Sequence, residues 1–323
     1  MDSAWERIID EFCIDMKTEQ NFRDNSIKAY RRKLIKMVGE FDKLDILKPI
    51  EQITEMEMKF WKTHLLAKKL SHNTIRHQHS IVKKFFYWYA NKYRLDDPCR
   101  TFRPIPEEIK DPFVPTPSEV AQMIVNVGTD TFHRRRNAAI IALFAGTGIR
   151  LSEICMLNVS DIIKKEDSFE VHIPMKKTRS RRVPFGDIQN VDILASTFGL
   201  YYLQIIAQGV KKNDPLFFSI NNDMHKNSLR PRTIQSIINK YGVVSSMKKL
   251  SPVELRHFFA TYLYLAGEDL RTIQRYMGHA LLTTTERYIY ISQRIKSNTH
   301  RLHPLNKFKR PELNKINQVI QSF

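Results

Sequence analysis

The sequence predicts a mainly α-helical protein with a small β-hairpin or sheet, divided into two domains by a proline-rich linker. Apolar residues recur at helical spacing through the first hundred residues, and six prolines then fall between Pro98 and Pro117. Farther on, an alternating apolar segment followed by a basic turn indicates the hairpin. We expect a helical domain over residues 1–100, a linker over 101–117, a second domain over 118–300 and a tail over 301–323.

Four helices are expected in the first domain. Their apolar positions are Trp5, Ile8, Ile9, Phe12 and Met16 in the first, Ile27, Tyr30, Leu34 and Met37 in the second, and Ile75, Val82, Phe85, Phe86 and Tyr89 in the fourth. Asn25-Ser26 is expected to cap the second helix, and Ser71-His72-Asn73 the fourth. The third covers residues 54–69. Buried apolar faces of this kind predict a helical bundle.

The second domain is expected to combine helices with one hairpin. A helix opens at Ser118-Glu119-Val120, and residues 137–145 are so continuously apolar that their helix should be buried on most sides. Residues 169–175 alternate like a strand, residues 176–182 form a basic turn, and residues 183–185 are apolar again. Residues 231–301 are expected to be helical, followed by a polar connection and an amphipathic stretch over residues 313–320 that binds a neighbouring protomer or packs on its own domain.

The charge of the chain favours a polyanionic partner. Lysine and arginine number 52 against 34 aspartate and glutamate, which gives a formal net charge of +18 and a pI near 9.7. Such an excess indicates nucleic acid, although a solvated basic surface is the alternative. The basic residues of the first domain that we expect to contact phosphates and grooves of DNA are Lys28, Arg31, Arg32, Arg76, Lys83 and Lys84.

Other side chains argue against metal, disulfide and membrane chemistry. The cysteines, Cys13, Cys99 and Cys155, lie far apart and are expected to be buried thiols in a reducing cytoplasm. The histidines His72, His77 and His79 are not spaced to share one helical face, so no metal site is expected. No apolar run reaches membrane-spanning length, and we expect a cytoplasmic, nucleoid-associated protein.

Three short runs could carry chemistry. The first is Gly146-Thr-Gly-Ile-Arg-Leu-Ser-Glu153, the second is Leu255-Arg-His-Phe-Phe-Ala-Thr261, and the third places His279 nine positions before Tyr288. Each has an ordinary structural alternative. Arg150 could be a surface residue after a helix C-cap and Arg256 an ion-pair partner, whereas His279 could cap a helix and Tyr288 could be a core residue.

In this order the runs resemble the catalytic domain of the tyrosine recombinase, or phage integrase, family. The resemblance covers residues 116–295 and includes "TGxRxxE", the basic hairpin, "LRHxFAT", and "LGH" before "TTxxY", with Met277 in place of the leucine. Residues 1–100 resemble the core-binding domain of the family by arrangement. The layout is most similar to chromosome-dimer and transposon resolvases, and the resemblance implies a core-binding domain followed by a catalytic domain.

The resemblance also implies a role for each matching residue. Arg150 and Arg256 would hold the scissile phosphate, and His279 would donate to a phosphate oxygen. Lys176 would be the general acid, chosen over Lys177 because it precedes Pro184 by eight positions. Tyr288 would be the nucleophile, with Tyr290 as the alternative.

One position departs from the family pattern. The family has His-x-Leu-Arg before the second run, and here Val253 occupies the place of that histidine. An isopropyl group neither accepts a proton nor donates a hydrogen bond, so one role is vacant. Because valine is smaller than histidine, we expect the surrounding residues to have closed around it. His257 matches a separate histidine of the family, and we do not assume that it substitutes.

The resemblance implies a site-specific recombinase that cleaves and rejoins double-stranded DNA through a 3′-phosphotyrosyl intermediate, with no metal, ATP or other cofactor. The partners would be two DNA sites and three further protomers in a homo-tetramer, with a hetero-oligomer as the alternative. Two other functions are considered. A DNA-binding protein that has lost catalysis would explain Val253, and a type IB topoisomerase would use similar chemistry to relax supercoiled DNA.

Overall fold

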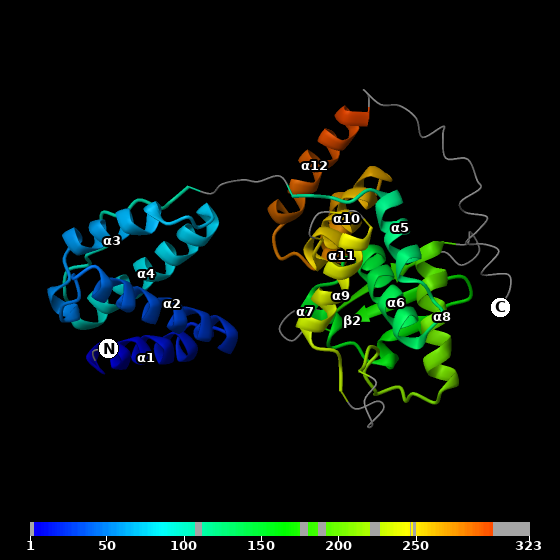
Figure 1. Cartoon of the computed structure of the whole chain (residues 1–323), viewed down its shortest axis with the longest axis horizontal. Coiled ribbons are helices and arrows are strands. Elements are labelled where there is room, and N and C mark those ends of the chain that lie inside the picture. The colour runs from blue at the N-terminus through cyan, green and yellow to red at the C-terminus, as the bar shows by residue number, and fades with distance from the viewer. Residues whose placement is uncertain are drawn as a thin grey trace. The chain divides into compact units, whose positions relative to one another are not determined.

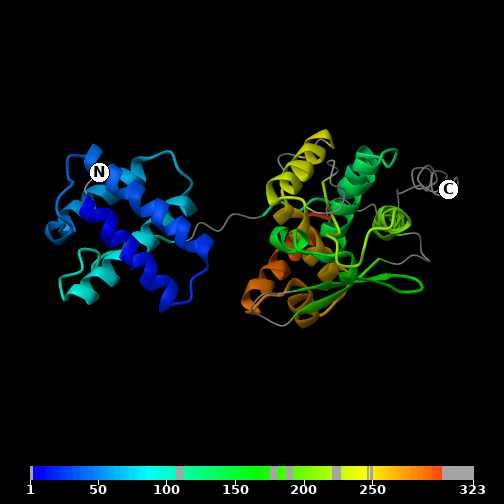
Figure 2. The same cartoon turned by 90° about the horizontal axis from the view of Figure 1, so that it is seen from below.

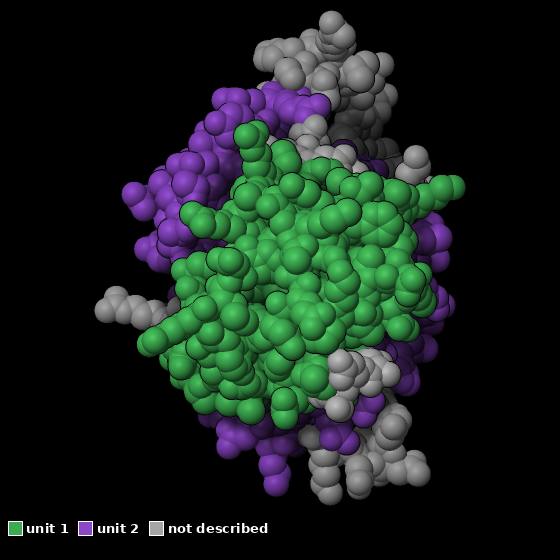
Figure 3. Space-filling view, turned by 90° about the vertical axis from the view of Figure 1, so that its left-hand side faces the viewer, with its two compact units in different colours: residues 1–110 green, residues 111–323 purple. Residues whose placement is uncertain are grey.

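The structure, a computed structural model, divides into two compact units over residues 1–110 and 111–323. Figure 3 shows these units in different colours. The described residues are 3–106, 112–174, 180–186, 192–219, 227–245, 247 and 250–299. Lys176, Lys177 and the predicted tail over residues 301–323 lie outside these ranges.

Unit 1 contains the four predicted helices (Figure 1). They are α1 (Ser3–Thr18), α2 (Asp24–Lys43), α3 (Glu55–Ala67) and α4 (His72–Tyr93), with a 3₁₀ turn at Ile50–Gln52. Thr54 and Glu57 form a capping box at α3, and Ser71 accepts from the Thr74 backbone at the start of α4. The predicted cap of α2 was wrong. The helix begins at Asp24 and Arg23 precedes it without a side-chain cap, so Asn25 and Ser26 lie in the first turn.

Aromatic rings fill the core of unit 1. Phe85 of α4 contacts Trp5 and Phe12 of α1 and its neighbour Phe86, with ring centroids 5.3 to 6.4 Å apart. All four side chains are at most 1% exposed. The helical spacing of the apolar residues therefore identified this core correctly, because each helix has one apolar face to bury.

Unit 2 is built around one buried helix. The helices are α5 (Pro117–Val127), α6 (Phe132–Thr147), α7 (Leu151–Ile154), α8 (Ile193–Ala207), α9 (Pro231–Val244), α10 (Pro252–Leu265), α11 (Leu270–Met277) and α12 (Thr283–Thr299), with a 3₁₀ turn at Val159–Asp161. Residues 138–145 of α6 are at most 2% exposed, because α5, α8 and α10 pack around this helix. This confirms the predicted buried helix, whereas α8 was not predicted.

The sheet has one strand more than the predicted hairpin. Strands β1 (Ile162–Lys164), β2 (Phe169–Ile173) and β3 (Arg181–Phe185) pair antiparallel in the order β1-β2-β3. Alternate residues of β2 and β3 are buried, so the sheet turns one face to the helices, as Figure 2 shows. The strand β1 was missed because only three residues pair and just Ile162 is buried.

The cysteines differ from the prediction at one position. Cys13 and Cys99 are buried free thiols, and burial raises the pKa of Cys13 to about 11. Cys155, which follows the four-residue helix α7, is only half-buried, and its Sγ atom lies 3.2 Å from the Leu151 carbonyl oxygen. In the described part of the chain, no helix is both long and apolar enough to span a membrane.

The glycine at position 146 lets β3 approach α6. A Cβ atom on Gly146 would lie 2.2 Å from the Phe185 ring, closer than packed atoms approach. Phe185 is itself 1% exposed and contacts the ring of Phe198 on α8. The ring therefore has little room to move, and the sheet docks on α6 through this contact.

We predict that Gly146→Ala lowers the free energy of unfolding by about 1–3 kcal/mol, because the added methyl group overpacks the contact with Phe185. Gly199→Ala on α8 is the matched control, since its nearest neighbours, two ring atoms of Phe169, lie at an ordinary 3.7 Å. It should be neutral or stabilising by up to about 1 kcal/mol. Chemical denaturation measures both, and an equal loss in the two variants would contradict the packing argument.

Candidate active site

Arg150 occupies the turn between α6 and α7. Gly148 ends α6 in the left-handed conformation, with φ of +58°, and Arg150 follows as the N-cap residue of α7. A non-glycine residue at 148 would be strained there, and its Cβ would also meet the Phe259 ring at 2.5 Å. The guanidinium donates to the carbonyl oxygen of Gly278 at 2.6 Å and to Glu153 at 2.7 Å.

Glu153 holds two arginines at once. Its carboxylate accepts from the backbone and side chain of Arg150, at 2.9 and 2.7 Å, and from both terminal nitrogens of Arg181, at 3.0 and 2.6 Å. Burial alone raises the pKa of Glu153, but Arg181 and Arg150 outweigh it and lower this pKa to about 2. Arg181 comes from β3 and also donates to the Tyr276 carbonyl oxygen at 2.6 Å. The carboxylate therefore ties α7, β3 and the end of α11 together.

Arg256 reaches the same segment from α10. Its guanidinium donates to the carbonyl oxygens of Gly148 and, at 2.5 Å, Met277. Burial and the neighbouring charge of Arg150 lower the pKa of Arg256 to about 10, which leaves it charged at neutral pH. Each guanidinium has five N–H donors, so these contacts orient both arginines and leave donors for an anion.

His279 follows a second left-handed glycine. Gly278 caps α11 with φ of +61°, and His279 then points its Nδ1 atom to the Thr285 hydroxyl at 2.8 Å. Thr285 is fully buried. Burial and the charges of Arg256 and Arg150 lower the pKa of His279 to about 4, so the ring is neutral at pH 7. The contact with Thr285 leaves Nε2 as the ring nitrogen available to a ligand.

Tyr288 lies on α12 within this group. Its side chain is 2% exposed, and its ring stacks parallel to that of His279 at 6.3 Å between centroids. The Tyr288 hydroxyl lies 3.2 Å from Nδ1 of His257. Burial raises the pKa of Tyr288, while the charges of Arg256, Arg287 and Arg150 oppose this shift. Tyr290, by contrast, is 69% exposed.

The structure thus brings together four of the five candidate catalytic residues: Arg150, Arg256, His279 and Tyr288. The fifth, Lys176, lies outside the described residues. Sequence reasoning missed the roles of Glu153, Arg181 and Thr285, although Glu153 stands three residues after Arg150 in a recognised motif. Arg181 carries no such signal, because it belongs to a run of basic residues that are alike in sequence.

Val253 lies at the start of α10 and is 55% exposed. We expected neighbouring side chains to have closed around this valine, and that expectation was wrong. Pro252 and Leu255 of the same turn are buried, but Val253 itself is exposed, so the position has room for a larger side chain. The vacancy in the family pattern is therefore a missing functional group, not a refilled cavity.

The basic residues of unit 1 fall into two groups. Lys28, Arg32 and Arg76 are exposed, as is Arg31, which pairs with Asp10 at 2.6 Å. Two lysines are half-buried: Lys83 donates to the Phe102 carbonyl oxygen at 2.7 Å, and Lys84 covers the Phe22 ring at 4.3 Å. These two lysines therefore support the fold of unit 1 as well as its charge.

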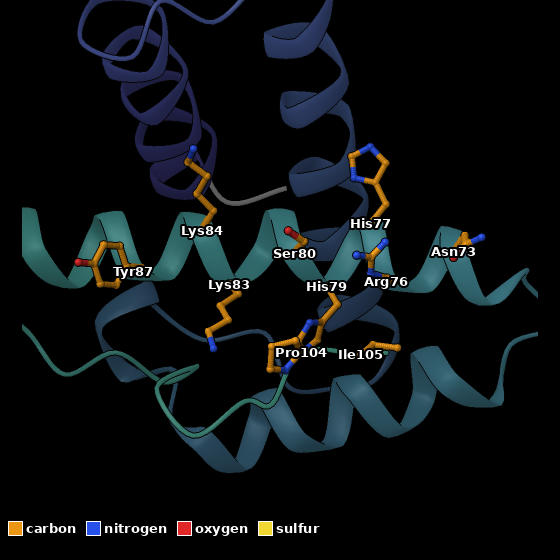
Figure 4. Close-up of a pocket in the computed structure, with 10 residues that line it drawn as sticks. All are labelled: Asn73, Arg76, His77, His79, Ser80, Lys83, Lys84, Tyr87, Pro104 and Ile105. Carbon is orange, nitrogen blue, oxygen red and sulfur yellow. The ribbon is translucent and has the colours of Figure 1, made fainter. Parts of the chain in front are cut away.

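A hollow on unit 1 lies along α4. It is lined by Asn73, Arg76, His77, His79, Ser80, Lys83, Lys84, Tyr87, Pro104 and Ile105. Figure 4 shows Lys83 and His79 pointing toward Pro104, whereas Lys84 points to the opposite side of α4. His79 stacks on the Phe102 ring at 5.4 Å, and burial lowers its pKa to about 4. Within the described residues, no group of three His, Cys, Asp or Glu side chains could hold a metal ion.

The chain matches two models of one family. The model of the phage integrase family matches residues 115–294, and that of the phage integrase N-terminal SAM-like domain matches residues 9–92. Curated relatives include tyrosine recombinase XerC of Thermodesulfovibrio yellowstonii, 28% identical over 93% of this chain and 97% of that protein. Tyrosine recombinase XerD of Haemophilus influenzae is 26% identical over 92% of this chain and 98% of that protein.

Solved structures show the same fold. The XerH site-specific recombinase bound to palindromic difH substrate, in a post-cleavage complex, aligns with a TM-score of 0.71 and 18% identity over 92% of this chain and 84% of that chain. The Tn1549 transposon integrase in complex with circular intermediate DNA aligns with a TM-score of 0.62 and 20% identity over 92% of this chain and 99% of that chain. These likenesses extend over both units.

We predict that Glu153→Gln lowers the free energy of unfolding by about 3–5 kcal/mol at pH 7, because it leaves buried charge on Arg181 uncompensated. The wild-type carboxylate has its pKa lowered from 4.5 to about 2, so its contribution is present above pH 4.5 and is lost as the pH falls toward 2. Denaturation curves at pH 7 and pH 3 should therefore show a smaller difference between the two proteins at pH 3. A constant difference would contradict the ionic role.

Proposed function

The chain belongs to the phage integrase family, and on this premise we propose that it is a site-specific DNA recombinase in which Tyr288 is the nucleophile. The observation that carries the proposal is the convergence of Arg150, Arg256 and His279 around one buried tyrosine. These residues come from four separate segments of the chain. Two charged guanidinium groups and a histidine beside one tyrosine suit the binding of a phosphodiester.

The proposed reaction proceeds in two reversible steps. The Tyr288 oxygen attacks the scissile phosphorus and forms the 3′-phosphotyrosyl bond, while the bond from phosphorus to the 5′ oxygen breaks. Lys176 supplies a proton to the departing 5′ oxygen. Attack by a 5′ hydroxyl then reverses the step and rejoins a strand. The covalent bond conserves the energy of the broken link, so the reaction needs no ATP.

The charged groups suit the transition state of this reaction. Negative charge grows on the nonbridging oxygens during attack, and the guanidinium groups of Arg150 and Arg256 carry fixed donors that stabilise it. We assign Nδ1 of His279 as the acceptor of the Thr285 hydroxyl proton, so that the neutral ring donates from Nε2. The same positive charges that hold the phosphate also oppose the rise in the pKa of Tyr288. In this proposal arginine, histidine and lysine side chains stabilise the phosphate charge and the leaving group, as a divalent metal ion does in other phosphoryl transfers.

Unit 1 is proposed to bind duplex DNA through phosphate contacts that do not depend on the base sequence. Lys28, Arg32 and Arg76 are exposed and can reach phosphates, and Arg31 can exchange Asp10 for a phosphate. The net charge of +18 favours the same partner. XerH and the Tn1549 integrase were both solved with DNA bound. We propose that four protomers assemble on two DNA sites, with residues 313–320 packing on a neighbouring protomer.

We predict that Tyr288→Phe abolishes the covalent protein–DNA complex and leaves DNA affinity within about twofold, because only the attacking oxygen is lost. Tyr290→Phe, on the exposed face of the same helix, is the matched control and should cleave normally. The measurement is denaturing electrophoresis after incubation with a nicked suicide substrate carrying the target site. A covalent adduct in the Tyr288 variant would refute the assignment.

We predict that Arg76→Ala reduces the slope of log affinity against log salt by about 0.9, the value for one lost phosphate contact on duplex DNA. Lys59→Ala removes the same charge from α3, at a position outside the proposed DNA-contacting residues, and should leave the slope unchanged. Fluorescence anisotropy over a salt series measures both. Equal slopes for wild type and Arg76→Ala would place DNA elsewhere on unit 1.

A further inference from the structure

A histidine lies on the same helix as Val253, the residue that stands in place of the family histidine. His257 lies four residues after Val253 on α10, and residues four apart share one helical face. Val253 is 55% exposed and has no polar atom in its side chain. His257 therefore brings an imidazole one turn farther along the helix, on the side where the family histidine would have been.

His257 contacts the reacting atom directly. Its Nδ1 atom lies 3.2 Å from the Tyr288 hydroxyl, within hydrogen-bond distance, and the two ring centroids are 5.7 Å apart at an angle of 56°. The Tyr288 side chain is 2% exposed, so bulk water has little access to the hydroxyl proton. A proton leaving this hydroxyl needs an acceptor inside the protein.

The protonation state of His257 suits an acceptor. Burial lowers the pKa of His257 to about 4, and the positive charges of Arg287 on α12 and of Arg256 lower it further. The negative charge of Glu254 opposes this shift. The ring is therefore neutral at pH 7, and one of its nitrogens carries a lone pair. A phosphodiester bound by Arg150 and Arg256 adds negative charge nearby, which raises this pKa and makes the imidazole a stronger base.

The other histidine of the site is engaged elsewhere. His279 places its Nδ1 on the buried Thr285 hydroxyl at 2.8 Å, and its ring stacks parallel to the Tyr288 ring. Of the two histidines that contact Tyr288, only His257 has a ring nitrogen at hydrogen-bond distance from the hydroxyl.

We propose that His257 is the general base of this chain and takes the role that Val253 leaves vacant. This inference rests on the proposed function, since it concerns the nucleophile of the same reaction. As the Tyr288 oxygen forms its bond to phosphorus, its O–H bond breaks and the proton passes to Nδ1 of His257. The electron pair of the O–H bond remains on the oxygen. In the reverse step the imidazolium returns the proton to the departing phenolate.

The test compares two substitutions of the full-length protein on a nicked suicide substrate under single-turnover conditions. His257→Ala removes the acceptor, whereas His257→Asn places an amide oxygen near the position of Nδ1, which accepts a hydrogen bond but takes no proton. Both should cleave about 10²-fold more slowly than wild type. His133→Asn, on an exposed histidine in the first turn of α6, is the control and should cleave at the wild-type rate.

The outcomes separate a base from a positioning group. If His257→Asn cleaves as fast as wild type, a hydrogen bond suffices and the proposal is overturned. A wild-type rate in His257→Ala would overturn it as well. Thermal unfolding and DNA affinity are measured for each variant, and if His257→Ala does not fold, His257→Asn decides alone. If the wild-type protein forms no covalent complex and Tyr288→Phe behaves identically, the proposed function itself is refuted. That conclusion does not depend on the His257 variants.

Discussion

The ion pair between Glu153 and Arg181 is the interaction on which the rest of the site depends. Both side chains are almost fully buried, at 6% and 4% exposed, so each charge would be costly without the other. Their bond fixes β3 against α7, and Arg181 extends it to the Tyr276 carbonyl at the end of α11. Glu153 then orients Arg150. An apolar pair could stabilise these elements equally well but could not position a guanidinium group.

Backbone carbonyl oxygens also orient the arginines of the site. Arg256 and Arg150 donate to the carbonyl oxygens of Met277 and Gly278, and Arg256 also donates to that of Gly148. Gly148 and Gly278 are both left-handed, which turns these carbonyls toward the arginines at the ends of α6 and α11. The positive charges are thus held in place without DNA. Such preorganisation costs little reorganisation when charge develops on a substrate.

The burial of Tyr288 has opposing consequences for its chemistry. A dry environment raises the pKa of the phenol and makes it a poor nucleophile, yet the same environment strengthens the attraction of Arg256 for its phenolate. The hydroxyl contact with His257 matters for this reason, because a buried proton cannot leave through water. Tyr290, two residues later, is largely exposed.

Sequence alone was enough for the features that depend on neighbours along the chain. Helical spacing located α1 and α4, and alternation located β2, because local periodicity decides which face of an element is buried. A continuously apolar run located α6. The runs around Arg150, Arg256, His279 and Tyr288 could be picked out as a candidate site for the same reason: each motif is contiguous. The helix α8 and strand β1 were missed, since the first is apolar all round and the second pairs only three residues.

Only the tertiary structure decided which polar groups meet. Glu153 and Arg181 are 28 residues apart, and His257 and Tyr288 are 31 apart, so no local pattern specifies either pair. Sequence comparison with a family pattern made Val253 a vacancy and predicted a closed cavity around it. The folded chain leaves that position exposed and brings His257 to the Tyr288 hydroxyl instead, because the packing of α10 on α12 selects the residue that faces Tyr288.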